Sequence, residues 1–190
     1  MSELRIYAER SPNIPQVVLP DLAGIQKQLA TIGVGFERWA ATQALDAQTP
    51  QDEVIDAYRA DIDRLMKRHD FKSVDVIGMY PTHPQKDAFR EKFLAEHTHD
   101  EYEVRFFVDG AALFYLHAQG RVFAMLCERD DLLSVPAGMT HWFDMGPAPS
   151  FKAIRLFTSP EGWVARYTGN DIAQHFPRYE APAYTPVAAT

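Results

Sequence analysis

Between residues 99 and 157 the chain is a succession of short segments rich in aromatic and β-branched residues. Turn signals separate them, with Asp109-Gly110 as a strong hairpin signal and Gln119-Gly120 as a second. Many short strands at this spacing are typical of a β-sandwich or a small β-barrel. The predicted strands are 99–108, 111–117, 121–127, 131–135, 141–145 and 151–157.

The first ninety or so residues have a mixed α/β pattern. Strands are predicted at "LRIYAE", at 34–39 and at "SVDVIGMYP". Asp21 is predicted to cap a first helix, and Thr49 a second helix with Pro50 in its first turn. Residues 84–95 also have a helical pattern. The apolar stripes of the first two helices are Leu22, Ile25, Leu29 and Ile32, and then Val54, Ile55, Tyr58, Ile62, Leu65 and Met66.

These segments predict a mainly β protein with peripheral helices, organised as a single domain over residues 1–190. Residues 1–95 are expected to pack as a mixed α/β part on a barrel core formed by 96–170. The proline- and alanine-rich tail 176–190 is expected to lie loosely on the surface.

Composition excludes several classes of protein. A hydrophobic fraction of 46% and an aromatic fraction of 12% are incompatible with a disordered chain. The net charge of -7 disfavours binding to nucleic acid or to anionic membranes. A single cysteine, Cys127, cannot form an intrachain disulfide, and neither a signal peptide nor a transmembrane segment is evident. We therefore expect a cytoplasmic protein, and a monomer.

The stretch "EHTHDEYEVRFFVDG" places His97, His99, Glu101, Glu103 and Arg105 at alternate positions. In a β-strand these side chains leave by the same face. The two imidazoles and the carboxylate of His-X-His-X3-Glu could together bind a borderline divalent metal such as iron, nickel, manganese or zinc. The sequence therefore predicts a metal site on one strand face.

A second segment, "VPAGMTHWFDMG", offers a further ligand. The turn at Pro136-X-Gly138 could orient the next strand so that His141 reaches the same point. In the alternative interpretation the polar row faces solvent, with Tyr102, Val104, Phe106 and Val108 packed inside. That alternative leaves His141 unexplained, and a buried ionisable row is costly without a compensating charge such as a metal.

The two segments together resemble the two-part motif of the cupin superfamily, which implies a small β-barrel or jelly roll. His97-X-His99-X3-Glu103-X6-Gly110 completes the first part. In the second part, Asp130 stands where a leading glycine is usual and Met145 where an asparagine is usual. These are turn and strand-end positions, so the metal assignment is retained.

Within the cupins, "HTHDEYEVRFFVDG", "VPAGMTHWFDMG" and "AIRLFTSPEGWVARYTG" resemble the acireductone dioxygenase family of methionine salvage, over about residues 93–169. The resemblance implies that His97, His99, Glu103 and His141 bind one divalent metal. With Fe(II), enzymes of this family cleave the acireductone with O2 to formate and the 2-keto acid precursor of methionine. With Ni(II) or Co(II) they carry out an off-pathway cleavage that releases carbon monoxide. Mn(II) would also suit the ligands.

Charged residues near the ligands are candidates for catalysis. Arg105 shares the ligand face and could offset the charge of an enediolate substrate, and Arg155 has a parity that could direct it to the same cavity. Glu96 and Glu101 flank the ligands and could remove a proton or hydrogen-bond a ligating imidazole. Solvated carboxylates at a strand entry are the alternative for both.

Aromatic residues could form an apolar slot for the methylthio tail, although ordinary core packing is the alternative for each. The candidates are Phe93, Phe143, Phe157 and Trp163. Two rival functions keep the same barrel. One is another cupin metalloenzyme with a different anionic substrate, such as a sugar phosphate; the other is a non-catalytic cupin that binds a small ligand. The complete ligand set argues against the second.

Overall fold

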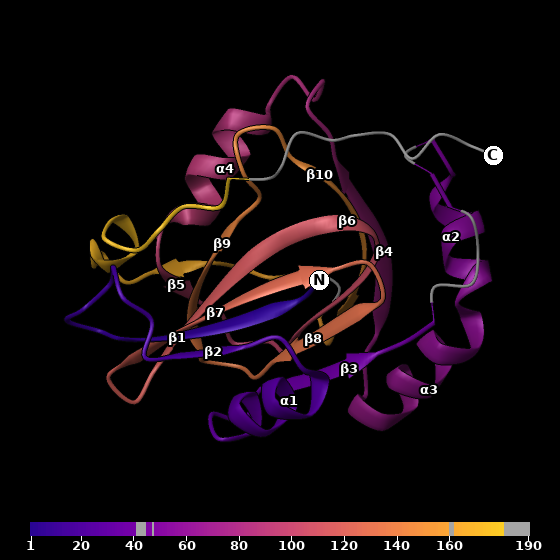
Figure 1. The fold of residues 1–190 in the computed structure, drawn as a ribbon. Coiled ribbons are helices and arrows are strands. Elements are labelled where there is room, and N and C mark those ends of the chain that lie inside the picture. Colours follow the sequence, from indigo (N-terminus) through magenta and orange to yellow (C-terminus); the bar gives the residue numbers. More distant parts are fainter. Residues whose placement is uncertain (41–44, 47, 160–161, 181–190) are drawn as a thin grey trace.

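A computed structural model describes residues 1–40, 45–46, 48–159 and 162–180 (Figure 1). Its strands form one connected hydrogen-bonded set that curls into a barrel, and the helices lie around the outside. This confirms the predicted mainly β fold with peripheral helices. The helices are α1 (Leu22–Ala30), α2 (Gln51–Ala57), α3 (Arg59–His69) and α4 (Lys86–Leu94), with a short 3-10 helix at Ile172–Gln174. The strands are β1 (Glu3–Ala8), β2 (Val17–Leu19), β3 (Gly35–Arg38), β4 (Ser73–Met79), β5 (His97–Thr98), β6 (Glu103–Ala118), β7 (Arg121–Glu128), β8 (Asp131–Val135), β9 (Thr140–Asp144), β10 (Ser150–Phe157) and β11 (Arg166–Tyr167).

Strand β6 connects the two sides of the barrel. Its first half pairs with β8 and β10, and its second half pairs with β7 and β9. The early strands complete the sheets, because β1 pairs with β7, β3 with β8 and β4 with β10. Every strand of the first part of the chain except β2 is therefore bonded directly to a strand of the second part.

The hairpin predicted at Asp109-Gly110 is wrong, since β6 runs through it without interruption. The register against β10 skips a residue here, from Phe107–Ala153 to Asp109–Lys152. Gly110 has φ of +69°, and a Cβ on it would lie 1.9 Å from the carbonyl oxygen of Ser150. The Asp-Gly pair thus forms a β-bulge within a strand, a feature that shares its glycine requirement with tight hairpins.

The bulge exchanges the inward and outward faces of β6. Before it, Phe107 lies in the barrel core while Val104 and Phe106 pack outward. After it, Phe114 and Leu116 lie in the core. An extra residue on one strand shifts the two-residue alternation by one position, which accounts for this exchange. It allows polar residues to face inward at one end of the barrel and large apolar residues at the other.

Helices α2 and α3 cover the outward face of the first half of β6. The single helix predicted here is wrong in detail, because it breaks at Tyr58 (φ -114°, ψ 17°). Thr49 does not cap it; the N-cap is Pro50, without a side-chain hydrogen bond. Val54, Ile62 and the other buried residues of the stripe pack on this face of the sheet. The predicted cap of α1 is confirmed, since Asp21 accepts a hydrogen bond from the amide of Gly24.

Two predicted turns are confirmed. Gln119 and Gly120, with φ of +55° and +68°, join β6 to β7. Gly138 has φ of +75°, and the amide of Met139 donates to the carbonyl of Pro136 at 3.2 Å. Asp130 takes φ of +80° at the position where the cupin motif has glycine, so the turn keeps its backbone shape with a residue type that tolerates it.

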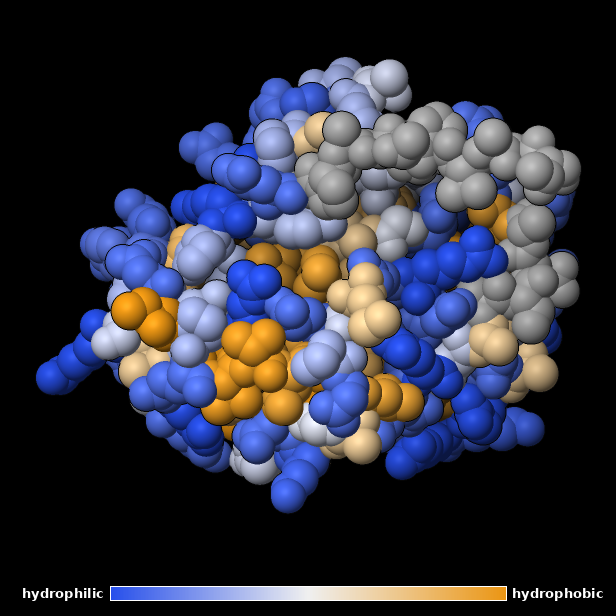
Figure 2. All heavy atoms as spheres, viewed as in Figure 1, coloured by the Kyte–Doolittle hydropathy of each residue, from blue (hydrophilic) through white to orange (hydrophobic). Residues whose placement is uncertain are grey.

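The C-terminal segment lies against the outside of the barrel. Ile172 and Phe176 pack with Trp142, and the amide of Tyr179 donates to Asp144 at 2.9 Å. Residues 181–190 of the predicted loose tail lie outside the described residues. Figure 2 shows a mostly hydrophilic face with a hydrophobic group over β1 and β2, where Val18 is 48% exposed. None of the described helices is long and apolar enough to cross a membrane.

Candidate metal centre

Three histidines, from β5, from the chain just after β5 and from the neighbouring strand β9, meet at one end of the barrel. His97 on β5 is the direct cross-strand partner of His141 on β9. The amide of Gly138 donates to the carbonyl of His99 at 2.8 Å, which ties the turn before β9 to the chain beyond β5. One ring nitrogen from each imidazole lies within 4.8 Å of the others. The predicted convergence of His141 with the first two histidines is therefore present.

Backbone carbonyls fix the orientation of all three imidazoles. Nδ1 of His97 lies 2.7 Å from the carbonyl oxygen of Ala95. Nδ1 of His99 lies 3.2 Å from the carbonyl oxygen of Glu101, and Nδ1 of His141 lies 2.8 Å from that of Met139. A carbonyl can only accept, so each Nδ1 carries the proton and each Nε2 is left with a free lone pair. This is the tautomer that a metal-binding histidine needs.

Glu103 adds a carboxylate to the same cluster. Its Oε2 lies 2.8 Å from Nε2 of His99 and 3.2 Å from Nε2 of His141. With Nδ1 protonated, these contacts place lone pair against lone pair, which is repulsive unless a cation lies between them. A proton or a divalent metal satisfies this requirement, and imidazole with carboxylate is the donor set of a borderline metal. The residues present therefore fit the metal that the sequence predicts.

Burial makes the cluster electrostatically demanding. Glu103, His99 and His141 are each at most 3% exposed, which excludes the alternative that the polar row faces solvent. Burial lowers the pKa of His97 to about 4, and the neighbouring His141 adds to this effect, so His97 is neutral at pH 7. Burial alone would raise the pKa of Glu103, but the positive charge of Arg105 and the close contacts with His141 and His99 hold it well below its usual range.

Arg105 lies directly behind Glu103. Its Nε donates to Glu103 Oε1 at 2.6 Å, and its guanidinium lies 4.6 Å from the ring centroid of Phe143 and 5.2 Å from that of Trp163. Among the described residues, the buried Nη1 of Arg105 has no hydrogen-bond partner. An unpaired charged donor in a buried site is costly, so this nitrogen is ready to bind an anion.

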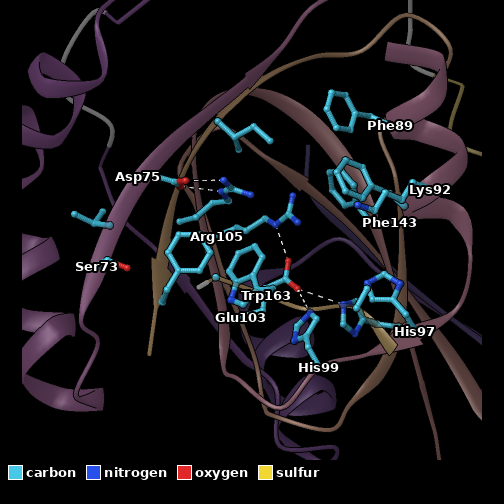
Figure 3. Close-up of a pocket in the computed structure, with 18 of the residues that line it drawn as sticks. Ser73, Asp75, Phe89, Lys92, His97, His99, Glu103, Arg105, Phe143 and Trp163 are labelled. Carbon is cyan, nitrogen blue, oxygen red and sulfur yellow. Dashed lines mark hydrogen bonds and ion pairs between the residues drawn. The ribbon is translucent and has the colours of Figure 1, made fainter. Parts of the chain in front are cut away.

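The cluster opens into a cavity of about 670 Å³ (Figure 3). In Figure 3, Asp75 lies at one side of Arg105 and His97 and His99 at the other, with Phe89, Lys92 and Phe143 beside helix α4. The structure brings all the predicted aromatic residues to this cavity, together with Arg155. The predicted residues that line it are His97, His99, Glu103, Arg105, His141, Phe93, Phe143, Arg155, Phe157 and Trp163.

The two flanking glutamates do not line the cavity. The carboxylate of Glu96 is buried between His117 Nδ1, at 2.7 Å, and Thr168 Oγ1, at 2.6 Å. Glu101 contributes only its backbone carbonyl, through the contact with His99. This placement gives neither carboxylate a contact with the metal cluster, so we assign neither of them a proton-transfer role.

Asp75 is a cavity residue that the sequence interpretation missed. It forms a bidentate ion pair with Arg155, with Nε–Oδ1 at 2.8 Å and Nη2–Oδ2 at 2.6 Å. The signal that could have found it is the alternation of "SVDVIGM", in which Ser73, Asp75 and Ile77 share one face. Phe89 and Lys92, on the inner side of α4, also line the cavity.

Comparison with known proteins identifies relatives along almost the whole chain. The sequence profile described as the ARD/ARD' family matches residues 3–165. Acireductone dioxygenase of Alcanivorax borkumensis is 54% identical over 177 residues, covering 93% of this chain and 98% of the relative. The Aquifex aeolicus enzyme of the same name is 52% identical over 180 residues, covering 95% and 97%. Acireductone dioxygenase from Bacillus anthracis, solved with a cadmium ion in its active centre, superposes with a TM-score of 0.78 at 28% identity, covering 88% and 98%.

Proposed function

The chain belongs to the ARD/ARD' family, the acireductone dioxygenases of the cupin fold, and on that premise we propose its substrate, metal and products. The substrate is the acireductone 1,2-dihydroxy-3-keto-5-methylthiopentene, which is cleaved with O2. The observation that carries the proposal is the convergence of three Nε2 lone pairs and one carboxylate beside the buried guanidinium of Arg105, whose Nη1 has no partner among the described residues.

His97, His99, Glu103 and His141 would hold one Fe(II) or Ni(II), with Co(II) and Mn(II) as further candidates. The fixed tautomers of the three imidazoles support this assignment, because each presents an unprotonated nitrogen to the same point. When bound, the metal would supply Lewis-acid polarisation of the two oxygens of a chelating substrate.

Arg105 binds and orients the enediolate. Three neutral imidazoles and one carboxylate leave a divalent site with one positive charge, so a dianionic substrate leaves the site one charge negative. The free Nη1 of Arg105 can donate to a substrate oxygen and offset that charge. Glu103 and the ring of Phe143 hold the guanidinium in place, so little reorganisation is needed when substrate binds.

The aromatic end of the cavity would receive the methylthio tail. Phe89, Phe93 and Phe143 form a connected group, with ring centroids 6.0 Å apart in both contacts. Thioether sulfur packs favourably at about 5 Å from aromatic rings. These residues therefore keep water from the tail and fix the direction in which the enediol end meets the cluster.

The products proposed depend on the metal. With Fe(II) they are formate and 4-methylthio-2-oxobutanoate, which serves methionine salvage. With Ni(II) or Co(II) they are formate, carbon monoxide and 3-methylthiopropanoate. In both cases the atoms of one acireductone and one O2 are fully accounted for, and no external reductant is needed.

We further propose that the chain acts as a monomer in the cytoplasm and folds as one unit. The pairing of β1, β3 and β4 with β7, β8 and β10 supports the single unit. The lone cysteine, which is buried and free, fits a reducing compartment.

An anaerobic mixing experiment tests the proposed function. Iron-loaded protein is mixed with the acireductone and then exposed to O2; loss of the enediolate absorbance with one equivalent of formate is expected. Arg105→Met should retain stoichiometric metal and lose most of its turnover. Arg59→Met, which removes an arginine from an exposed ion pair between α3 and Asp56 of α2, is the matched control and should behave as wild type. Persistence of the enediolate with the metal-loaded wild type would refute the proposal.

A further inference from the structure

Four charged residues form a continuous row across the cavity wall. Asp75 on β4 is the cross-strand partner of Arg155 on β10, and Arg155 is in turn the partner of Arg105 on β6. Glu103 follows on the same face of β6. All four line the cavity, with two negative groups at the ends of the row and two positive groups in the middle (Figure 3).

The two arginines differ in what they can offer a ligand. Asp75 occupies the Nε and Nη2 positions of Arg155, so Arg155 cannot present this planar fork to an anion. Arg105 uses only Nε for Glu103, and its Nη1 is buried without a partner among the described residues. Asp75 thus restrains the guanidinium of Arg155 but not that of Arg105.

The restraint matters because the two guanidinium groups are neighbours. Both lie near the ring of Trp163, at 5.2 Å for Arg105 and 5.4 Å for Arg155. Arg155 and Arg105 are cross-strand partners and both carry a positive charge, so they repel each other, and the carboxylate of Asp75 lies 2.6 Å from Nη2 of Arg155. Asp75 therefore compensates electrostatic repulsion between the two side chains.

We propose that Asp75 is a positioning residue for the dioxygenase reaction, which keeps Arg155 away from Glu103 and the enediolate so that Arg105 alone donates to the substrate. The inference rests on the proposed function. Without the Asp75 charge, the freed fork of Arg155 would seek the nearest anion, either Glu103 or the bound substrate. The cavity would also gain one positive charge. Substrate would still bind, but in a geometry less suited to reaction.

Asp75→Asn tests this, because it is isosteric and Asp75 is partly exposed. We expect kcat to fall about tenfold or more, since small misplacements in an active site have effects of this size. KM, and the dissociation constant for acireductone measured without O2, should stay unchanged or decrease. In an Arg155→Gln background, Asp75→Asn should cause no further loss of kcat, because it acts through Arg155. A merely structural role would instead lower the melting temperature and metal content in both backgrounds.

Asp61→Asn is the matched control. It removes the same charge from an exposed pair with Arg64 on α3 and should leave both constants unchanged. If Asp75→Asn does not fold, Asp75→Ser also removes the carboxylate that holds Arg155 and should reduce kcat in the same way. Wild-type kcat in either of these cavity variants, or losses that multiply in the double variant, would overturn the inference alone. A wild type that neither binds nor consumes acireductone would overturn the proposed function, and the inference with it.

Discussion

Replacing Gly110 with alanine should destabilise the barrel more than the same replacement at other glycines with a similar backbone. A Cβ at Gly110 would lie 1.9 Å from the carbonyl oxygen of Ser150 and 2.7 Å from Cα of Phe151. These are backbone atoms of β10, which cannot rotate away. Gly120 and Gly169 have φ of +68° and +75°. A Cβ at Gly120 would have its nearest neighbour 3.9 Å away, and a Cβ at Gly169 would have no neighbour within 4 Å. The three sites therefore share the conformation and differ in the contact.

The magnitude follows from two contributions. A left-handed conformation costs a non-glycine residue about 1–2 kcal/mol, and the smaller unfolded-state entropy of alanine offsets about 0.4–1 kcal/mol of this. The controls should therefore lose about 1 kcal/mol. At Gly110 the added Cβ would also force β10 outward, which costs about 1–3 kcal/mol more. The cost should lie near the upper limit, because the contact is with backbone atoms. A total of about 3–4 kcal/mol should lower the melting temperature by about 10 °C in a chain of this length.

Urea unfolding followed by circular dichroism compares the three variants with wild type. Gly110→Ala is expected to be the least stable by at least about 2 kcal/mol. It should also reduce turnover, because β10 carries Arg155. If Gly110→Ala were as stable as Gly120→Ala, the bulge would not depend on the close approach of β10. The exchange of faces along β6 would then need another cause.

Two further predictions concern the core and the domain organisation. Cys127 is fully buried, and burial raises the pKa of its thiol well above the usual range. The thiol should therefore stay protonated and resist iodoacetamide at about pH 8 until urea unfolds the protein. Rapid alkylation of the native protein would contradict this. Residues 96–190 expressed alone should not fold, because β7, β8 and β10 would lose β1, β3 and β4. A dispersed amide NMR spectrum from that fragment would show that the barrel does not need the first part of the chain.

Local patterns in the sequence were sufficient where local physics decides the structure. The alternation of Glu103 and Arg105 predicted inward polar side chains on one strand, and the structure buries both on β6. The prediction that His97 and His99 share that strand is wrong, because β5 ends at Thr98 and β6 begins at Glu103. The turn chemistry of Gly138 predicted how β9 begins and where His141 points. In both cases, backbone periodicity and a glycine with positive φ determine the outcome within a few residues.

The β-bulge at Asp109-Gly110 and the helix break were missed for a different reason. An Asp-Gly pair suits both a hairpin turn and a bulge, and only the partner strand β10, some forty residues later, distinguishes them. The apolar stripe through Tyr58 continues across the break between α2 and α3, so periodicity alone gives no sign of it.

Long-range pairing explains what the sequence could not show about the site. Asp75 meets Arg155 across 80 positions of the chain, and Glu96 meets Thr168 across 72. No spacing rule connects such partners. A strand parity could place Asp75 on a face, but the identity of its partner depends on the order of strands in the sheet.

Three imidazoles and one carboxylate are proposed to bind a single divalent metal in the cavity. A crystal structure of nickel-loaded protein, with data collected at the nickel absorption edge, tests it directly. We expect one anomalous peak, about 2.1 Å from Nε2 of His97, His99 and His141 and from a carboxylate oxygen of Glu103. A peak that excludes His141, or one located away from this cluster, would contradict it.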